Sequence, residues 1–376
     1  MRLRRRGMRA IVAVGTAATL TVGLSACSSN DRTLTSAATA EVAGTSSAAP
    51  APSPSPTSSS PTPTSPTAEP TPEPATSAAE PTPEPPPPAP VDPLTGGAPS
   101  GNPVLAVKIE NTAGGWPQYG TGQADVVYVE QVEGGLTRLL ALFHSSLPEE
   151  VGAVRSLRTT DTEVLPAYGS PALLFSGGAG GPLDALADTP VVDASGMGVT
   201  WRSSAAKAPY NLHANLQQLA AAVGDRSPAR DAGFTFAAGD SRLDAAPAVT
   251  SIAVQFQAAR AAFAWNGSAY AVQRNGGSAA DAQGTAITAD NVVVMNVTAE
   301  PDGVVDSVGS PSYISHTVGD GTFTLFRNGR ALDGHWWRGA ADQPFRYEDA
   351  SGAALPFAPG STWIVLATQT TTTETG

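Results

Sequence analysis

The chain has 376 residues, one cysteine, 34 prolines and a formal net charge of −12. A single cysteine excludes an intramolecular disulfide and any zinc or iron–sulfur site that needs several cysteines. The acidic balance argues against a nucleic-acid partner, because contacts to phosphates need a basic face.

Residues 1–26 predict a lipoprotein signal peptide. Five arginines precede an uncharged apolar run from Ala10 to Leu24, which is too short to span a bilayer comfortably. Leu24-Ser25-Ala26-Cys27 then resembles a bacterial lipobox, a signal that is cut before its cysteine and lipidated on the sulfur. We therefore expect a chain anchored through Cys27 to the outer face of the cytoplasmic membrane. The alternative is a chance thiol beside an ordinary signal peptide.

Residues 27–92 predict a disordered tether. Proline, serine, threonine and alanine dominate this stretch, and 18 of the 34 prolines lie between Pro50 and Pro93. A segment with so few large apolar residues cannot offset the entropy of ordering, and its prolines favour polyproline II. Such a tether would hold the folded part away from the membrane. An alternative role is docking into a proline-binding groove of a partner.

Residues 93–240 predict a mixed α/β domain. The turn Glu133-Gly134-Gly135 separates two β runs at the spacing of a hairpin. Thr160-Asp161-Thr162-Glu163 resembles a capping box, with Thr160 as the cap of a helix. The other expected elements are strands at 104–110, 124–132, 136–145 and 172–176, a short apolar piece at 151–156, and helices at 181–187 and 215–223.

Residues 247–369 predict a β-rich domain, so the expected fold class is α+β. Asn266-Gly267 and Asn328-Gly329 stand where type I′ turns favour residues that tolerate a positive φ. Residues 370–376 are expected to form a polar tail that frays. The expected strands are 252–256, 263–265, 270–273, 292–297, 323–326, 345–347 and 363–366.

Short motifs follow one another through the folded part. In the first half they are Pro93-Leu94-Thr95-Gly96, Ala106-Val107-Lys108-Ile109-Glu110-Asn111, Gln123-Ala124-Asp125-Val126-Val127-Tyr128, Val132-Glu133-Gly134-Gly135-Leu136-Thr137-Arg138, Val151-Gly152-Ala153-Val154-Arg155-Ser156, Ser176-Gly177-Gly178 and Asn211-Leu212-His213. In the second half they are Arg327-Asn328-Gly329-Arg330, Gly334-His335-Trp336-Trp337-Arg338 and Pro359-Gly360-Ser361-Thr362-Trp363-Ile364. Together these motifs resemble the YerB-like lipoproteins of Gram-positive bacteria, from about Asp92 to Ala367. The resemblance implies a two-part extracytoplasmic lipoprotein and assigns no catalytic residue, because the family is a domain of unknown function.

Charged side chains gather between residues 110 and 161, within otherwise apolar strands. Partly buried charges need partners, which leaves two interpretations open. Arg155 and Arg158 flank a predicted helix start and could bind a carboxylate or phosphate there. Alternatively, the charges form structural ion pairs that clamp strand ends. The candidate ligand-binding residues are Glu110, Asn111, Glu130, Glu133, Arg138, Arg155, Arg158, Asp161, Ser176 and His213.

Three kinds of chemistry can be compared with the sequence. Ser176 and His213 are the best pair for serine hydrolysis, but Ser176 lacks the Gly-x-Ser-x-Gly context, and a strand-ending Ser-Gly-Gly is typical of a turn. Glycoside hydrolysis needs two facing carboxylates, for which Glu110, Glu130, Glu133 and Asp161 are candidates. The four histidines lack the spacing of a metal site. We therefore predict no metal and no cofactor.

The sequence favours a membrane-anchored binding or scaffolding module of the cell envelope. Its ligand would be a cell-wall fragment or an envelope protein, and it has no nucleic-acid partner. The alternative is a hydrolase or transferase that acts on wall glycan or peptide through an acidic and arginine-lined cleft. The oligomeric state is left open.

Overall fold

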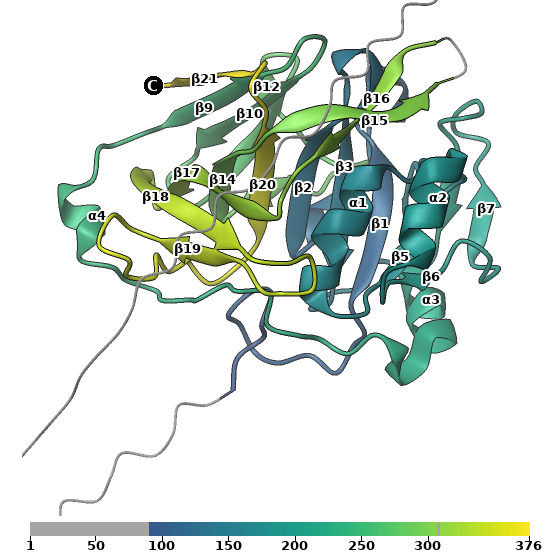
Figure 1. The fold of residues 1–376 in the computed structure, drawn as a ribbon, viewed down its shortest axis with the longest axis horizontal. Coiled ribbons are helices and arrows are strands. Elements are labelled where there is room, and N and C mark those ends of the chain that lie inside the picture. The colour runs from purple at the N-terminus through teal and green to yellow at the C-terminus, as the bar shows by residue number, and fades with distance from the viewer. Residues whose placement is uncertain (1–89, 307–308) are drawn as a thin grey trace, which may run out of the picture. The chain divides into compact units, whose positions relative to one another are not determined.

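The computed structural model describes residues 90–306 and 309–376. The predicted signal peptide, the predicted lipidation site Cys27 and nearly all of the predicted tether lie outside these residues. The described part forms 21 strands and four α-helices (Figure 1). The α+β prediction is therefore confirmed in its coarse form, with β-sheet dominant and the helices few and short.

Ten strands form a central sheet, and they come from both predicted parts of the chain (Figure 1). Where the parts meet, β2 runs parallel to β20, and Val127 lies opposite Trp363. All six residues of β2 are buried, as expected of a strand covered on both faces. The strand order is β19 (Arg346–Glu348), β18 (Arg330–Arg338), β17 (Gly319–Arg327), β14 (Asn291–Asn296), β20 (Thr362–Ala367), β2 (Val126–Gln131), β3 (Thr137–Phe143), β1 (Leu105–Glu110), β5 (Ala172–Leu174) and β6 (Val192–Asp193).

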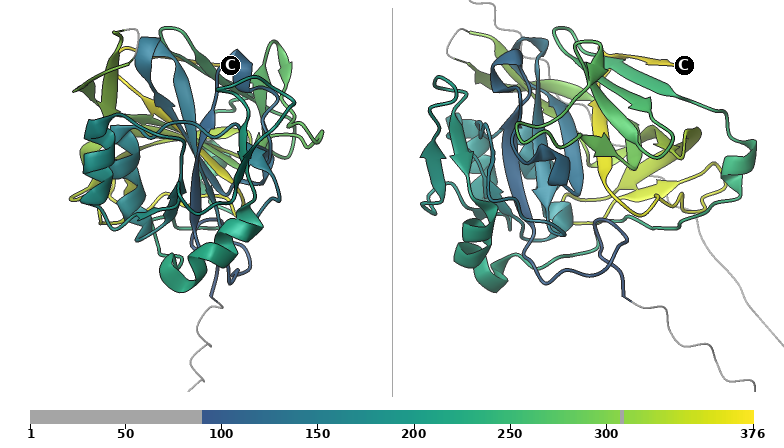
Figure 2. Two further views of the ribbon diagram at one scale, coloured as in Figure 1. Left: turned by 90° about the vertical axis from the view of Figure 1, so that its right-hand side faces the viewer. Right: turned by 180° about the vertical axis from the view of Figure 1, so that it is seen from behind.

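A second sheet covers one face of the central sheet. Phe263 of the second sheet meets Trp363 edge to face, with ring centroids 5.7 Å apart. Figure 2 shows this sheet on the side of the molecule away from α1 and α2. Its strands are β12 (Gly277–Ser278), β11 (Tyr270–Arg274), β10 (Arg260–Trp265), β9 (Ser251–Gln255) and β21 (Thr372–Thr375), in that order, and β13 (Thr288–Ala289) pairs with β11.

Helices and an aromatic cluster cover the opposite face of the central sheet. The helices α1 (Thr159–Val164) and α2 (Gly180–Ala187), with the 3-10 helix η4 (Leu165–Tyr168), lie over the β1 and β5 side (Figure 1). Phe234 and Phe357 pack with centroids 5.0 Å apart over the other side. Charged residues on this face of β1 to β3 therefore end up next to α1.

Smaller elements border these layers. The hairpin of β15 (Ala299–Val305) and β16 (Pro311–Ser315) stands beside α1. The sequence does not predict this hairpin, because Glu-Pro-Asp-Gly within β15 is typical of a turn and most of the strand faces solvent. The remaining elements are β4 (Val151–Gly152), β8 (Leu212–Ala214) and β7 (Thr200–Arg202), which form a three-stranded sheet, and the helices α3 (Leu216–Val223) and α4 (Arg242–Ala245).

The predicted cap of α1 is wrong by two residues. The helix begins at Thr159, and Asp161 Oδ2 accepts a 2.8 Å hydrogen bond from the backbone N–H of Arg158. The carboxylate of Glu163 does not fold back to the helix start, because it accepts the backbone N–H of Val318 at 2.7 Å. Glu163 therefore makes a tertiary contact in place of the helix cap that the motif predicted.

Two predictions about the second half were also wrong. Asn328 and Gly329 have φ values of 54° and 70°, as a type I′ turn requires, but at the other turn only Gly267 has a positive φ. Residues 372–375, expected to fray, form β21, which pairs antiparallel with β9. The polar composition of β21 concealed a strand that lies at the edge of a sheet.

Candidate functional site

The central sheet places the predicted charged residues in one row. Arg138 of β3 lies opposite Glu110 of β1 on one side and Glu130 of β2 on the other. Side chains alternate between the faces of a sheet, so Lys108 shares the face of Glu110. These four residues therefore lie on the face that α1 covers.

Lys108 joins two buried carboxylates. Its Nζ lies 2.7 Å from Asp161 Oδ1 and also forms an ion pair with Glu130, and all three side chains are almost fully buried. Burial lowers the pKa of Lys108 to about 8, although the charge of Asp161 and its hydrogen bond oppose the shift. Because Asp161 belongs to α1 and Lys108 to β1, the pair fastens the helix to the sheet.

Glu110 is similarly engaged. Its Oε2 lies 3.0 Å from Arg155 Nε, and its Oε1 accepts the backbone N–H groups of Asn111 and Thr112 at 3.0 and 2.9 Å. The side chain of Asn111 donates to Thr137 Oγ1 at 2.9 Å. These contacts hold the loop after β1, and they leave Glu110 only 2 % exposed.

Arg138 differs from its neighbours because it has no acceptor among the described residues. It is 8 % exposed, and its Nε and Nη1 are buried without a hydrogen-bond partner. Burial, followed by the charges of Arg158 and Arg155, lowers its pKa to about 10 against the opposing effect of Glu110 and Glu133. A buried guanidinium with unpaired donors is costly, so this position favours an additional acceptor such as water or an anion.

A pocket of about 240 Å³ opens beside this cluster, next to the ion pair in which Arg158 Nη2 lies 2.7 Å from Glu133 Oε2. Burial opposes ionisation of Glu133, but the hydrogen bond and charge of Arg158 outweigh it and lower the pKa of Glu133. The other walls are the segment from Ser156 to Arg158, the start of α2, and the hairpin of β15 and β16. Four elements that are distant in sequence therefore build the pocket.

Hydrogen-bond donors occur among the residues that line the pocket. In the described part of the chain no side chain caps the first turn of α2, whose N-cap is Ala179. Ser312, at the hairpin wall, is 1 % exposed and its Oγ has no hydrogen-bond partner in the described part of the chain. Arg158 Nε is also unpartnered there. A helix N-terminus, a guanidinium and a hydroxyl together suit a small anionic group.

Ser176 and His213 lie in different surroundings. Ser176 adjoins the pocket, since its backbone N–H donates to Arg155 O at 2.8 Å and its carbonyl accepts Ser156 Oγ at 3.0 Å. His213 lies on β8, where its Nδ1 is 2.7 Å from Glu150 Oε1 and its ring meets Tyr119 at 4.5 Å. Within residues 90–306 and 309–376, no hydrogen bond joins Ser176 to His213.

A serine, a histidine and an aspartate that no sequence motif connects do meet. Ser100 Oγ lies 3.1 Å from His144 Nε2, and Asp92 Oδ2 lies 3.2 Å from the same nitrogen. A catalytic triad needs the serine and the carboxylate on opposite ring nitrogens. Here Nδ1 of His144 is buried and has no hydrogen-bond partner among the described residues. The contact thus anchors the segment before β1. Ser100 and His144 are 44 residues apart, so no local sequence motif indicates their contact.

The described residues contain no cluster of three or more His, Cys, Asp or Glu side chains arranged to hold a metal ion. Nor does any helix in residues 90–306 and 309–376 have the length and apolar character needed to cross a membrane.

Comparisons with known proteins match the parts of the chain that carry the sequence motifs. Residues 94–229 match the N-terminal domain of a protein of unknown function (DUF3048), and residues 252–364 match its C-terminal domain. A Bacillus subtilis (strain 168) protein, named as a candidate lipoprotein YerB, is 26% identical over an alignment of 283 residues that covers 69% of this chain and 80% of that protein. The crystal structure of the Bacillus subtilis YerB protein is similar with a TM-score of 0.62 at 20% identity, over 76% of this chain and 100% of that chain. That likeness shows a shared fold.

Proposed function

Because the chain belongs to the YerB-like (DUF3048) family, we propose that it is a lipid-anchored envelope protein that binds an anionic group of an envelope ligand. The anchor is Cys27, and the binding site is the pocket beside Arg158. The related Bacillus protein is named as a lipoprotein, which supports the anchor. The ligand class is a cell-wall fragment or an envelope protein that presents a carboxylate or a phosphate.

One observation carries the assignment of the pocket. The uncapped start of α2, the guanidinium of Arg158 and the buried hydroxyl of Ser312 border the same space of about 240 Å³. A space of this size accommodates a terminal or side group of a polymer, but not the polymer itself. Guanidinium groups bind both carboxylates and phosphates through paired hydrogen bonds, so both sources fit.

The burial of the carboxylates supports binding over catalysis. Glu110, Glu130 and Asp161 are at most 2 % exposed, and each already has a cationic partner. Glycosidases need one carboxyl with a raised pKa to donate a proton. The pKa of Glu133, which lines the pocket, is instead lowered. The alternative of a hydrolase or transferase would have to use Glu133 with Asp306, the other carboxylate of the pocket wall.

Titration of the full chain with inorganic phosphate and with propionate tests the proposal and separates the two anions. We expect one of them to bind with a salt-dependent affinity, and Arg158→Gln to weaken that binding about tenfold or more, since hydrogen bonds to charged groups contribute about 1.5–3 kcal/mol. Ser312→Ala should weaken it less. The matched control is Arg346→Gln, a change at an arginine with 64% side-chain exposure on β19.

Two results would contradict the proposal. One is that neither anion binds the unchanged protein at millimolar concentration. The other is that Arg158→Gln and the Arg346→Gln control have equal effects. Turnover of wall fragments that Glu133→Gln abolishes would support the hydrolase alternative instead.

A further inference from the structure

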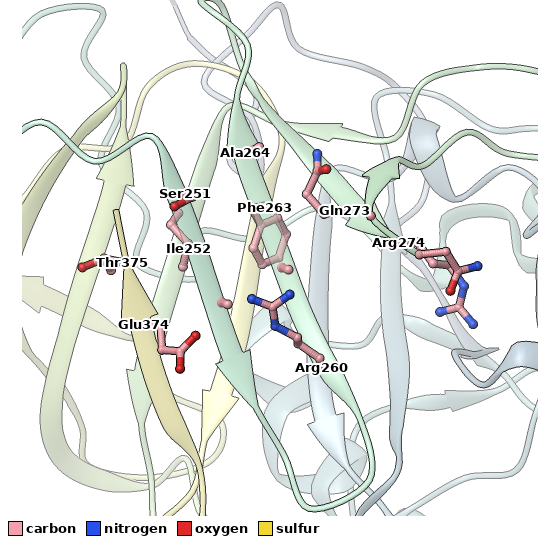
Figure 3. Close-up of a pocket in the computed structure, with 13 residues that line it drawn as sticks. Ser251, Ile252, Arg260, Phe263, Ala264, Gln273, Arg274, Glu374 and Thr375 are labelled. Atoms are coloured by element: carbon pink, nitrogen blue, oxygen red, sulfur yellow. The ribbon is translucent and has the colours of Figure 1, made fainter.

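A second hollow lies apart from this pocket, on the outer face of the second sheet. It has a volume of about 600 Å³ and crosses β21, β9, β10 and β11 (Figure 3). This volume is within the range of small-molecule and short-peptide sites. Four strands at about 4.8 Å spacing give a trough about 14 Å long, and its part from β21 to β10 spans about 10 Å, which matches about three residues of extended peptide.

The floor of the trough consists of small side chains. Ala253 of β9 lies opposite Ala262 of β10, and Ser251 lies opposite Ala264. Large side chains of the same strands, such as Phe263, are turned inward to the core. The floor is thus smooth and mostly apolar, and it offers no aromatic ring on which a sugar could stack.

Two opposite charges reach over this floor. Glu374 projects from β21 and Arg260 from β10, and Figure 3 shows the two side chains pointing toward one another across the floor. Neither has an ion-pair or hydrogen-bonding partner among the described residues. An acid and a base that face one space without meeting are complementary to a ligand that carries both charges.

The trough continues at its far end. Arg274 and Asn275 line both the trough and a neighbouring pocket of about 380 Å³. There Arg274 stacks on Trp116, with its guanidinium carbon 4.5 Å from the ring centroid. Burial lowers the pKa of Arg274, but the side chain remains a cation at neutral pH. This neighbouring pocket thus adjoins the trough at β11, beyond the strands that carry the two facing charges.

We propose that this trough binds a short peptide with small side chains, whose amino group contacts Glu374 and whose carboxylate contacts Arg260. An unbranched chain of small residues fits a floor of alanines, because larger side chains would lift the backbone away from the sheet. The peptide carries one positive and one negative end, which matches the two charges of the trough. This site is independent of the anion pocket beside Arg158.

Calorimetric titration of the full chain with tri-alanine, N-acetylated tri-alanine and tri-alanine amide tests this assignment. We expect millimolar or tighter binding of tri-alanine, and about fivefold weaker binding of each blocked peptide. Glu374→Gln should weaken the binding of tri-alanine about fivefold but leave the acetylated peptide unaffected. Arg260→Gln should likewise weaken the binding of tri-alanine about fivefold but leave the binding of tri-alanine amide unaffected. Arg346→Gln is the matched control.

Ala262→Phe raises the floor and should abolish binding, with the near-ultraviolet circular dichroism unchanged. If this variant does not fold, the two charge variants decide the question. Three results would overturn the proposal: no binding of tri-alanine, equal effects of the charge variants on free and blocked peptides, or a dimer in sedimentation that Ala262→Phe dissociates. The last result would mean that a second copy of the chain covers the trough.

Discussion

Replacing Lys108 with methionine removes the cation between two buried carboxylates. Lys108, Glu130 and Asp161 are each 0 % exposed, so little water can replace the lost charge. Removal of one partner from a buried ion pair typically costs about 3–5 kcal/mol, because the remaining charge stays unpaired. Folded domains are stable by about 5–15 kcal/mol, so this single change should bring the protein close to unfolding.

Urea unfolding followed by tryptophan fluorescence measures this effect, and the chain has six tryptophans to report it. The matched control is the triple variant Lys108→Met, Glu130→Met and Asp161→Asn, in which all three charges of this ion-paired group are removed. It should regain most of the lost stability, to within about 2 kcal/mol of the unchanged protein. Asparagine at 161 keeps an oxygen for the backbone N–H of Arg158, which Asp161 accepts at 2.8 Å.

Either of two results refutes the reasoning. A loss below about 1 kcal/mol in the single variant would mean that relaxation or water reaches the carboxylates after all. A triple variant as unstable as the single variant would mean that the packing of methionine, and not the unpaired charge, causes the loss.

Two further predictions concern backbone space and the chain end. Gly233→Ala should lower the free energy of unfolding by about 3 kcal/mol or more in thermal unfolding, because the added Cβ would lie 1.8 Å from Phe345 O. The control Gly352→Ala, with open space around it, should lower it by about 1 kcal/mol. Equal losses in the two variants would contradict this reasoning. Ending the chain at residue 371 removes β21, so amides of β9 should exchange faster by mass spectrometry while those of β2 do not change.

Local patterns in the sequence identified most strands of the central sheet. Runs such as Val126 to Val129 and Val292 to Met295 are apolar throughout, and both form strands covered on two faces. The pattern failed where strands are polar or contain turn residues, as in β15 and β21. Such strands depend on a single neighbour for their hydrogen bonds, so their own composition says little about them.

The sequence also grouped the charged residues of the first half, but it could not assign their partners. Lys108, the residue that binds two of the predicted carboxylates, carried no signal of its own within a strand. Arg138 resembled its neighbours in the sequence, although it alone of the cluster's arginines lacks an acceptor in the described residues. Which residues pair depends on which strand ends lie beside α1. The paired residues are up to 53 positions apart in the sequence.

By itself the sequence determined the family to which this protein belongs, the positions of most of its apolar strands and most of the residues that form its charged cluster, because these are encoded by neighbouring residues. Only the tertiary structure decided that β2 pairs with β20, that Arg158 and Ser312 border one pocket, and that Glu374 faces Arg260 across a floor of alanines. Each of these joins segments more than a hundred residues apart, and such pairings follow from how whole sheets bury their apolar faces.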